Sequence, residues 1–311
     1  MGSPSAICTL FEGDYHLGAA ALLNSLHAAG FRGRVFCGLR GPLPPWAGEP
    51  QTTAGSTACC RIGDGLEVHF VTLATGIHFT NFKPEFLLDL WRGPAADADT
   101  LFYFDPDIVV KCPWTALARW ADGGVALCED VNPSLPARHP QRLGWTAFLE
   151  RHGLPVTASR ERYYNAGFLA VSIAQRPLLE HWRDLIAKVG QENGSLQTLK
   201  HGAAHALFHT PDQDALNLAL MTLDVPVNAV GPEGMDFALG GNYLSHAIGG
   251  RKPWRGGFLR QALQGYPPSL AAKNFFRHVD RPTSIFSSGR RRRLLAALRL
   301  GALIGRFYRR G

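Results

Sequence analysis

The chain has 311 residues and six cysteines, a formal net charge of +7, and a composition that is 46% hydrophobic and 18% charged. This is the composition of a globular protein, and it excludes a disordered chain and a fibrous repeat. An excess of positive charge can indicate a nucleic-acid or a membrane-surface partner, so its location along the chain decides what it implies.

The positive excess belongs to the C-terminal tail. Residues Ser288–Gly311 contain eight arginines and no acidic residue. Of the 32 lysines and arginines in the chain, 24 therefore remain to face 25 acidic residues elsewhere. Because the rest of the chain is close to neutral, we expect no nucleic-acid partner.

The cysteines and the N-terminus indicate a reducing compartment. No Cys-x-x-Cys pair occurs, which argues against a zinc ribbon or a thioredoxin-like motif. Cys8, Cys37 and Cys128 lie in apolar runs and are predicted to be buried thiols. A basic leader with an apolar core is absent, as is any run of about 18 apolar residues, so we predict neither a signal peptide nor a transmembrane helix. A cytoplasmic location is expected.

In chain order, the hydrophobic pattern predicts alternating strands and helices, which is typical of an α/β fold. The predicted strands are Ala6–Phe11, Arg34–Leu39, Glu67–Leu73, Thr100–Phe104, Gly124–Cys128, Gly167–Ser172 and Val225–Val230. The predicted helices are Leu17–Ala29, Pro84–Trp91, Pro177–Val189 and Asp212–Thr222. Gly41–Gly65 is rich in Pro, Gly, Ser and Thr and is predicted to be an irregular loop, and Asn132–Arg162 and Gln191–His209 are expected to be irregular as well.

Two acidic residues follow a predicted strand directly. Asp105 and Asp107 flank Pro106 between the runs Leu-Phe-Tyr-Phe and Ile-Val-Val. Side chains two residues apart on an extended chain point the same way, so the two carboxylates should converge at the end of a sheet. Such a pair repels itself unless a cation or a proton intervenes, and oxygen ligands suit Mg²⁺ or Mn²⁺. A solvated turn is the alternative interpretation.

A second unusual segment runs from His246 to Trp254. The imidazole of His246 can supply a further metal ligand. Gly249 and Gly250 allow close backbone approach to a phosphate, and Lys252 offers a compact positive charge for a diphosphate. Read alone, this segment is better explained as a glycine-rich loop with a surface lysine.

Four ordered segments resemble those of the metal-dependent GT-A nucleotide-sugar glycosyltransferases of family eight, which includes bacterial lipopolysaccharide galactosyl- and glucosyltransferases. Phe102–Val110 is similar to the strand and Asp-x-Asp segment of that family, and Tyr164–Phe168 to its Asn-Ala-Gly element. Asp212–Asn217 resembles its Asp-Gln-Asp helix start, and His246–Trp254 its His-x-x-Gly-x-x-Lys-Pro-Trp segment. With the N-terminal half, the resemblance covers residues 6–265.

The resemblance implies one GT-A domain, a Rossmann-like mixed sheet flanked by helices, over residues 1–281. It also implies a retaining hexosyltransferase that uses a UDP-sugar donor, Mn²⁺ or Mg²⁺, and a glycan or lipid-linked acceptor. The metal ligands would be Asp105, Asp107 and His246. Three groups of residues would contact the donor. The uracil and ribose would contact Glu12 and Asp14, and the diphosphate would contact Lys83, Gly249 and Lys252. The sugar would contact Asn165, Asp212 and Gln213. Lipopolysaccharide biosynthesis is the process that it suggests.

The residue types favour one course of reaction. The departing diphosphate needs electrostatic support, from a metal and from Lys252, and the electron-poor sugar needs polar groups such as Asp212 and Gln213. The amide of Gln213 is a poor nucleophile, which favours attack on the same face as the leaving phosphate. A covalent intermediate on Asp212 or Asp214 stays open. Asp212 can also serve as a helix N-cap, and Asp214 as a first-turn acid.

The tail, residues 282–311, is predicted to be a basic amphipathic helix. Arg292, Arg299 and Arg306 recur every seven residues, and Ala297, Leu300, Ile304 and Phe307 line another face. Such a helix can lie on an anionic membrane, here the inner face of the cytoplasmic membrane. A helix docked on the rest of the chain and a disordered tail are the alternatives.

Two other functions remain open from the sequence. A sugar-phosphate nucleotidyltransferase commonly has a basic glycine-rich loop after its first strand, whereas this chain has the acidic Glu12-Gly13-Asp14 there. A non-catalytic membrane-peripheral protein on the same scaffold would not need the metal ligands, yet all three candidates are present. The sequence does not distinguish among donor sugars or acceptors.

Overall fold

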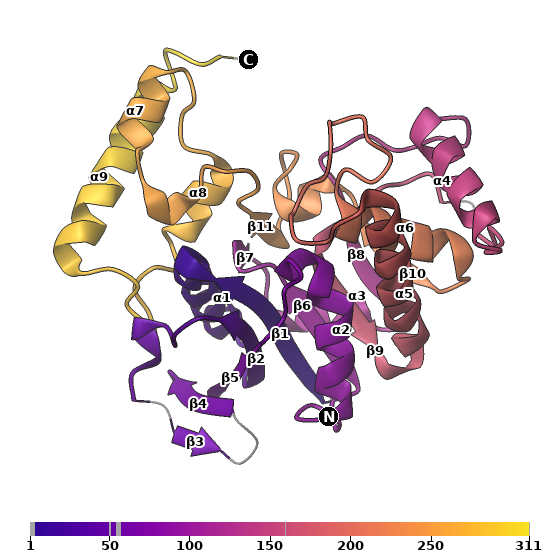
Figure 1. Ribbon diagram of the computed structural model, residues 1–311. Helices are drawn as coiled ribbons and strands as arrows, with labels where there is room; N and C mark the ends of the chain where they lie inside the picture. Colours follow the sequence, from indigo (N-terminus) through magenta and orange to yellow (C-terminus); the bar gives the residue numbers. More distant parts are fainter. Residues whose placement is uncertain (1–3, 50, 54–56, 159, 311) are drawn as a thin grey trace.

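A mixed β-sheet forms the centre of the molecule in the computed structural model, which describes residues 4–49, 51–53, 57–158 and 160–310 (Figure 1). Among these residues the sheet has nine strands in the order β10-β8-β9-β6-β1-β2-β5-β4-β3. The strands are β1 (Ser5–Glu12), β2 (Gly33–Arg40), β3 (Gln51–Thr53), β4 (Thr57–Ile62), β5 (Leu66–Thr72), β6 (Thr100–Phe104), β8 (Val125–Glu129), β9 (Tyr164–Ser172) and β10 (Val227–Val230). Parts of the predicted ranges at residues 1–3, 50, 54–56, 159 and 311 lie outside the described residues.

Parallel pairing runs through the middle of the sheet. β1 pairs in parallel with both β2 and β6, and β2 pairs in parallel with β5. β9 is antiparallel to β6 and β8, which makes the sheet mixed. The carboxyl ends of β1 and β6 therefore lie side by side, at the edge where α/β folds bind ligands.

Helices cover both faces of the sheet, because each face is a continuous apolar surface. The core on one side includes side chains of α2 (Phe79–Arg92), α4 (Pro140–Arg151), α5 (Arg176–Asn193) and α6 (Pro211–Thr222). The core on the other side includes side chains of α1 (His16–Ala28) and α3 (Trp114–Ala121). Cys8, Cys37 and Cys128 are buried in these two cores, as predicted, and each is a free thiol. The predicted α/β fold class is confirmed.

Several segments differ from the sequence prediction. The predicted loop Gly41–Gly65 contains the antiparallel strands β3 and β4, and Asn132–Arg162 contains the helix α4. Glycine, proline and threonine are abundant in the first segment, and for this reason the strand β4, which includes Cys-Cys-Arg-Ile and pairs with β5, was not predicted. Trp145, Phe148 and Leu149 of α4 are buried in the core, and tertiary packing thus outweighs a polar sequence.

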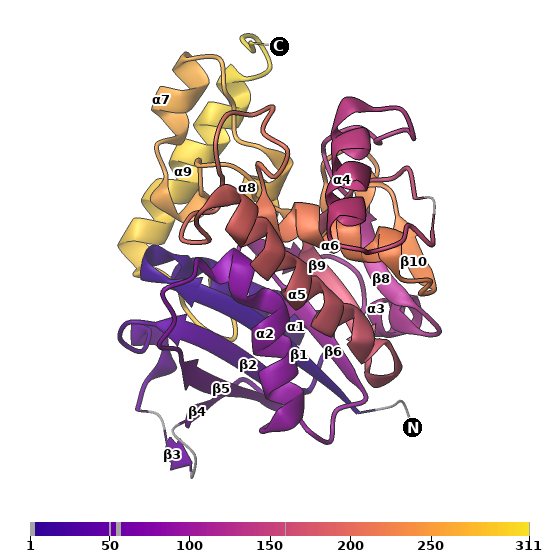
Figure 2. The same ribbon diagram turned by 45° about the vertical axis from the view of Figure 1, so that its right-hand side comes forward.

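The C-terminal residues form a small helical unit next to α1 and a two-stranded sheet. That sheet pairs β7 (Ile108–Val110) with β11 (Leu244–His246). The helices α7 (Phe258–Leu263), α8 (Leu270–Phe275) and α9 (Ser288–Ile304) lie together at one corner of the molecule in both views (Figures 1 and 2). A third apolar core, which includes Trp254, Phe258 and Phe275, joins them to α1.

The basic helix α9 packs against α7 and α8. Leu298 is buried in the third core, and a side chain at Gly301 would meet the Phe258 carbonyl at 3.0 Å. The inward face is therefore built on Leu298 and Gly301, whereas Leu300 and Phe307 of the predicted apolar face are exposed. Arg292, Arg299 and Arg306 are exposed as well. No helix in the described part of the chain is long and apolar enough to cross a membrane.

Candidate active site

The Asp-Pro-Asp turn is held tightly at the end of β6. The amide of Asp105 donates to the Gly167 carbonyl at 2.7 Å, and the Tyr103 hydroxyl donates to the Asp105 carboxylate at 2.9 Å. Glycine at position 18 lets helix α1 approach closely, because a side chain there would lie 2.3 Å from the Pro106 carbonyl. The turn is thus fixed from both sides, and both carboxylates face the same pocket.

Pairing of β11 with β7 brings His246 to the acidic pair, although 139 residues separate it from Asp107 in the chain. His246 is the register partner of Ile108. Its Nε2 atom lies 3.1 Å from Asp107 Oδ1 and 3.9 Å from Asp105 Oδ2. The ligand atoms of these three residues all lie within 4.8 Å of one another, a spacing that a single divalent cation can bridge.

The surroundings also fit a bound cation. A Cβ at position 167 would lie 2.6 Å from His246 Cε1 and 2.9 Å from Asp105 Oδ2, so only glycine leaves these ligands in place. Two carboxylates and an imidazole form a donor set that suits Mn²⁺ or Mg²⁺. Asp105, Asp107 and His246 would hold the ion.

Two lysines neutralise the acids of the site. Lys83 is 2% exposed and donates to Asp212 Oδ2 at 3.0 Å and to the Ala166 carbonyl at 2.9 Å. Its Nζ atom also lies 3.2 Å from Asp105 Oδ1. Lys252 binds Asp107 and donates to the Ala247 carbonyl at 2.7 Å. Each acid of the metal pair is thereby matched by one ammonium group.

These contacts fix the charge states. Burial alone would lower the pKa of Lys83, but Asp105 and Asp212 outweigh it and raise that pKa, so the ammonium stays protonated. Burial alone would raise the pKa of Asp107, yet His246 and Lys252 hold it well below its usual range. At neutral pH the site therefore contains an ionised Asp107 and, beside Asp105 and Asp212, a protonated Lys83.

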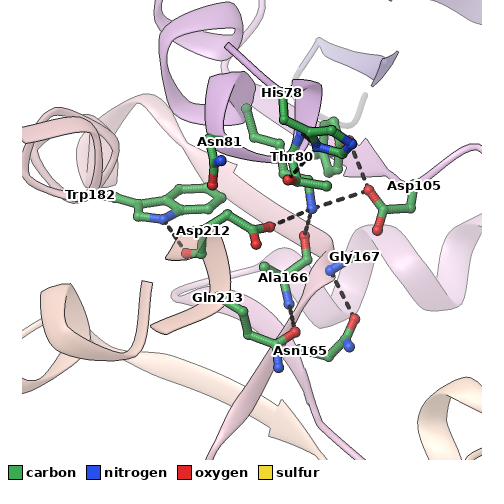
Figure 3. Close-up of polar contacts among 12 residues, drawn as sticks. His78, Thr80, Asn81, Asp105, Asn165, Ala166, Gly167, Trp182, Asp212 and Gln213 are labelled. Atoms are coloured by element: carbon green, nitrogen blue, oxygen red, sulfur yellow. Dashed lines mark hydrogen bonds and ion pairs between the residues drawn. The ribbon is translucent and has the colours of Figure 1, made fainter. Parts of the chain in front are cut away.

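The start of α6 supplies the polar wall opposite the metal ligands. Trp182 donates to the Asp212 carbonyl at 2.8 Å (Figure 3). The Asp212 Oδ1 atom is buried and has no hydrogen-bond partner within the described part of the chain. Gln213 accepts from the Ala166 amide at 3.1 Å. Asn165 accepts from the Gly167 amide at 2.8 Å and donates to Asp130 Oδ2 at 2.6 Å. Asp212 thus retains a free acceptor.

Asp214 differs from its neighbours, because its carboxylate is turned into the protein. It accepts from the Tyr163 hydroxyl at 2.8 Å and from the Thr210 amide at 2.9 Å. Burial raises the pKa of Asp214 to about 7, although these two hydrogen bonds act in the opposite direction. It is not among the described residues that line the pocket. This placement favours the structural interpretation of Asp214 as an acid of the first helical turn.

One pocket of about 640 Å³ collects ten of the eleven residues singled out from the sequence. The ten are Glu12, Lys83, Asp105, Asp107, Asn165, Asp212, Gln213, His246, Gly249 and Lys252. Asp14 lies elsewhere, because Arg255 pairs with its carboxylate at 2.7 and 2.8 Å. Glu12 lines the pocket while it pairs with Arg40 at 2.9 Å.

The pocket also contains residues that the sequence analysis missed. Asp130 follows β8 at the same sheet edge and accepts hydrogen bonds from Asn165 and from Asn132. His78 stands at the start of α2. Asp130 had a readable signal, since an acid directly after a buried strand is the feature that identified Asp105. His78 had none, because its place depends on where α2 begins.

Comparison with known proteins was positive only at the level of structure. No family model and no curated protein sequence matches the chain. A galactosyltransferase LgtC, solved in complex with donor and acceptor sugar analogues, has a TM-score of 0.50 and 17% identity over 88% of this chain and 94% of its own. An active-site mutant of LgtC has a TM-score of 0.53 and 14% sequence identity, over 91% of this chain and 98% of its own. The bifunctional glycosyltransferase WbbM has a TM-score of 0.51 and 12% sequence identity, over 90% of this chain and 50% of its own. This chain therefore has the GT-A-like fold of the galactosyltransferase LgtC.

Proposed function

We propose that the chain is a metal-dependent retaining glycosyltransferase that moves a hexose from a UDP-sugar to a glycan or lipid-linked acceptor. The observation that carries this proposal is the cluster of Asp105, Asp107 and His246, which opens into a large pocket on an LgtC-like fold. A pocket that combines a cation site, lysines and an unpaired carboxylate oxygen suits a charged, hydroxylated donor.

At the diphosphate, the chain supplies position and charge. Asp105, Asp107 and His246 would hold Mn²⁺ or Mg²⁺, and a bound cation of this kind stabilises a departing diphosphate as a Lewis acid. Lys252 lines the pocket with Gly249 and Gly250, where its ammonium can shift from Asp107 toward a phosphate oxygen. Lys83 keeps Asp105 and Asp212 in place.

At the sugar, the buried carboxylate of Asp212 has the free capacity to accept a hydroxyl hydrogen bond. Gln213 and Asn165 present amide groups on the same wall of the pocket. An ionised or polar wall also stabilises the positive charge that develops on the sugar ring. Glu12 remains our candidate for contact with the nucleoside, whereas Asp14 would first have to leave Arg255.

We favour a mechanism in which the acceptor attacks the sugar on the same face from which the phosphate leaves. The side chain of Asp214 is oriented away from the pocket, which argues against a covalent intermediate there. Asp212 is paired with Lys83, which lowers its nucleophilicity. In the same-face course the acceptor oxygen bonds to the anomeric carbon, the bond to the diphosphate breaks, and the leaving phosphate oxygen takes the acceptor proton.

The first experiment is a screen of UDP-sugars for hydrolysis and transfer with Mn²⁺. We expect turnover of one or a few UDP-hexoses, a loss of at least about 100-fold in Asp107→Asn, and retention of configuration by proton NMR. Asp224→Asn, at an exposed position outside the pocket, is the matched control and should leave the rate unchanged. Metal-independent hydrolysis, or no hydrolysis of any UDP-sugar, would reject the proposal.

The same protein samples separate the alternatives. A sugar-phosphate nucleotidyltransferase would release pyrophosphate from UTP and a sugar 1-phosphate, which we do not expect. A non-catalytic protein on this scaffold would bind UDP and Mn²⁺ and turn over neither substrate set.

We also propose that α9 and its neighbours contact an anionic membrane surface, the inner face of the cytoplasmic membrane. Two exposed arginines, Arg292 and Arg299, share the helix with the exposed Leu300 and Leu303, and the exposed Arg306 follows its end. Leu263 of α7 is 69% exposed and Phe307 is 86% exposed. Exposed leucines and aromatics beside arginines are typical of helices that lie at a lipid surface. A lipid-linked acceptor would then be close to the enzyme.

Sedimentation with vesicles tests this contact. Because each arginine near anionic headgroups contributes about 1 kcal/mol, Arg292→Glu with Arg299→Glu should weaken binding to phosphatidylglycerol vesicles by about 30-fold or more. The control pair, Arg119→Glu with Arg138→Glu, makes the same charge change at exposed sites outside the helix. If both pairs of substitutions weaken vesicle binding equally, net charge alone explains the binding, and the proposed contact through α9 is rejected. Absence of vesicle binding by the unchanged protein would also reject the membrane contact.

A further inference from the structure

A second group of metal-ligating side chains lies far from the pocket, near the outer end of the sheet. Cys59 stands on β4 and Glu67 and His69 stand on β5, and the three ligand atoms all lie within 4.8 Å of one another. Figures 1 and 2 show β4 and β3 at the end of the sheet. None of these residues lines the pocket described above.

The antiparallel register explains the grouping. Cys59 is the direct cross-strand partner of His69, so their side chains lie on the same face. Glu67 precedes His69 by two residues and therefore shares that face. Leu66, Val68 and Phe70 point to the opposite, buried face. One half-exposed face of two adjacent strands thus presents a thiol, a carboxylate and an imidazole.

The distances match tetrahedral coordination. Glu67 Oε1 lies 3.5 Å from Cys59 Sγ and 3.5 Å from His69 Nε2. Donors bonded to one zinc ion at 2.0–2.3 Å, in a tetrahedral arrangement, are separated by about 3.3–3.8 Å. The Glu67 oxygen therefore already lies at the expected ligand-to-ligand distance from each of the other two donor atoms.

The environment leaves the donors available. The Nε2 atom of His69 is buried and makes no hydrogen bond of correct geometry, while its ring stacks on Phe36 at 5.0 Å. Arg34, the neighbour of Glu67 on β2, is engaged by Asp97 at 2.6 Å. Arg61, opposite Glu67 on β4, is exposed. The side chain of Glu67 is 44% exposed, which gives an ion a path from solvent and room for water as a fourth ligand.

We propose that Cys59, Glu67 and His69 form a second cation site, which binds Zn²⁺ with one thiolate, one carboxylate and one imidazole. A thiolate and an imidazole select zinc over the magnesium or manganese that suit the oxygen-rich pocket. Binding would tie β4 to β5, displace the thiol proton into solvent, and brace the end of the sheet.

Cobalt titration of the metal-free full chain tests the proposal, because a thiolate ligand gives Co²⁺ a near-ultraviolet charge-transfer band and the oxygen- and imidazole-lined pocket does not. We expect the band to saturate by two equivalents, because the pocket can take up the other ion, and to disappear when Zn²⁺ is added. Cys59→Ser should abolish it. His69→Gln should weaken Zn²⁺ binding by at least about tenfold, since even loss of an outer-shell partner costs that much.

The neighbouring Cys60 provides the matched control. Cys60 pairs with Val68 and belongs to the opposite face, so Cys60→Ser should keep the band. In that variant Zn²⁺ should also protect Cys59 from alkylation, a readout that leaves all three ligands intact and does not depend on the folding of Cys59→Ser. Absence of the band in the unchanged chain, its persistence in Cys59→Ser, or its loss in Cys60→Ser would overturn the proposal.

Discussion

A single glycine sets the spacing of the metal ligands. A Cβ at position 167 would lie 2.6 Å from His246 Cε1, 2.8 Å from Asn165 Oδ1 and 2.9 Å from Asp105 Oδ2. Real side chains do not tolerate such contacts, so the ligands would have to move apart. The Asn-Ala-Gly motif is therefore explained by steric room at the metal ligands as much as by the asparagine.

We predict that Gly167→Ala lowers the affinity for Mn²⁺ by at least about tenfold while it destabilises the fold by about 1–3 kcal/mol, the usual cost of overpacking. Isothermal titration with Mn²⁺ and urea unfolding measure the two effects. Gly76→Ala is the control, because a Cβ there would meet nothing within 4 Å. Unchanged Mn²⁺ binding in Gly167→Ala would contradict this role.

The buried Asp214 predicts a pH dependence of stability. Its pKa is raised from 3.8 to about 7 in the folded chain. Between these pH values the folded state holds a proton that the unfolded state has lost, so stability falls as pH rises, by up to about 1.4 kcal/mol per pH unit from this group. Below pH 4 both states are protonated, and above pH 7 both are ionised.

Asp214→Asn removes this titration. Between pH 5 and pH 7, the unfolding free energy of the variant should fall less steeply with pH than that of the unchanged chain, by up to about 1.4 kcal/mol per pH unit. Urea unfolding at several pH values measures this difference. Asp224→Asn, at an exposed residue, should keep the slope of the unchanged chain. Parallel slopes in all three proteins would show that Asp214 is ionised when folded.

Much of the candidate site could be predicted at the residue scale, because motifs with fixed spacing carry it. Ten of the eleven predicted residues line one pocket. Asp14 was expected at the nucleoside but is not among the described residues that line the pocket, and its pairing with Arg255, 241 residues away in the chain, could not be predicted. Asp130 was missed although it follows a buried strand, because its neighbouring acid Glu129 is one residue away and the two do not form an Asp-x-Asp pair.

At the scale of elements, the strands from β10 to β5 were predictable, and the β4–β3 end of the sheet was not. Thr100–Phe104 matches β6 residue for residue, because a fully buried strand gives a continuous apolar run. β7 and β11 are three residues long each and are defined only by their mutual pairing. The edge strand β3 and its neighbour β4 lie among turn residues, where local composition outweighs a weak alternation.

Helix α9 shows how an amphipathic pattern can be ambiguous. Leu298 is 8% exposed and belongs to the third core, whereas Leu303 of the same helix is 48% exposed. Heptad-spaced arginines reveal which face meets solvent, but they do not reveal which leucines meet the protein. The docked arrangement follows from contacts with α7 and α8, and these are invisible in the sequence of α9 alone.

We predict that Leu298→Ala destabilises the chain by about 2–3 kcal/mol, the lower part of the range for buried leucines. Leu303→Ala should cost less than about 0.5 kcal/mol, since it lies largely in solvent. Urea unfolding measures both, and faster proteolysis near residues 282–288 should accompany the first. Equal and small losses would mean that α9 does not dock in solution.

At the scale of the whole molecule, the pocket joins parts of the chain that are distant in sequence. The ends of β1 and β6 and the starts of α2 and α6 each supply lining residues. β11 supplies His246, and the segment after it supplies Lys252. A parallel sheet places strand ends together, so the location of the pocket was predictable from the fold class. Its closure by the C-terminal residues depends on the β7–β11 pairing and was not.

The lining of this pocket also has an electrostatic consequence for the sequence in which ligands bind. Among the residues that the structure describes, five acids and three lysines line the pocket: Glu12, Asp105, Asp107, Asp130 and Asp212, and Lys83, Lys200 and Lys252. Without a cation this cavity carries an excess of negative charge and repels a nucleoside diphosphate, whereas one divalent ion cancels that excess. We therefore predict an obligatory order, cation first and nucleotide second. UDP affinity measured by calorimetry should fall by more than about tenfold when EDTA is present, and Mn²⁺ should bind without UDP; nucleotide binding of equal strength under both conditions would exclude that order.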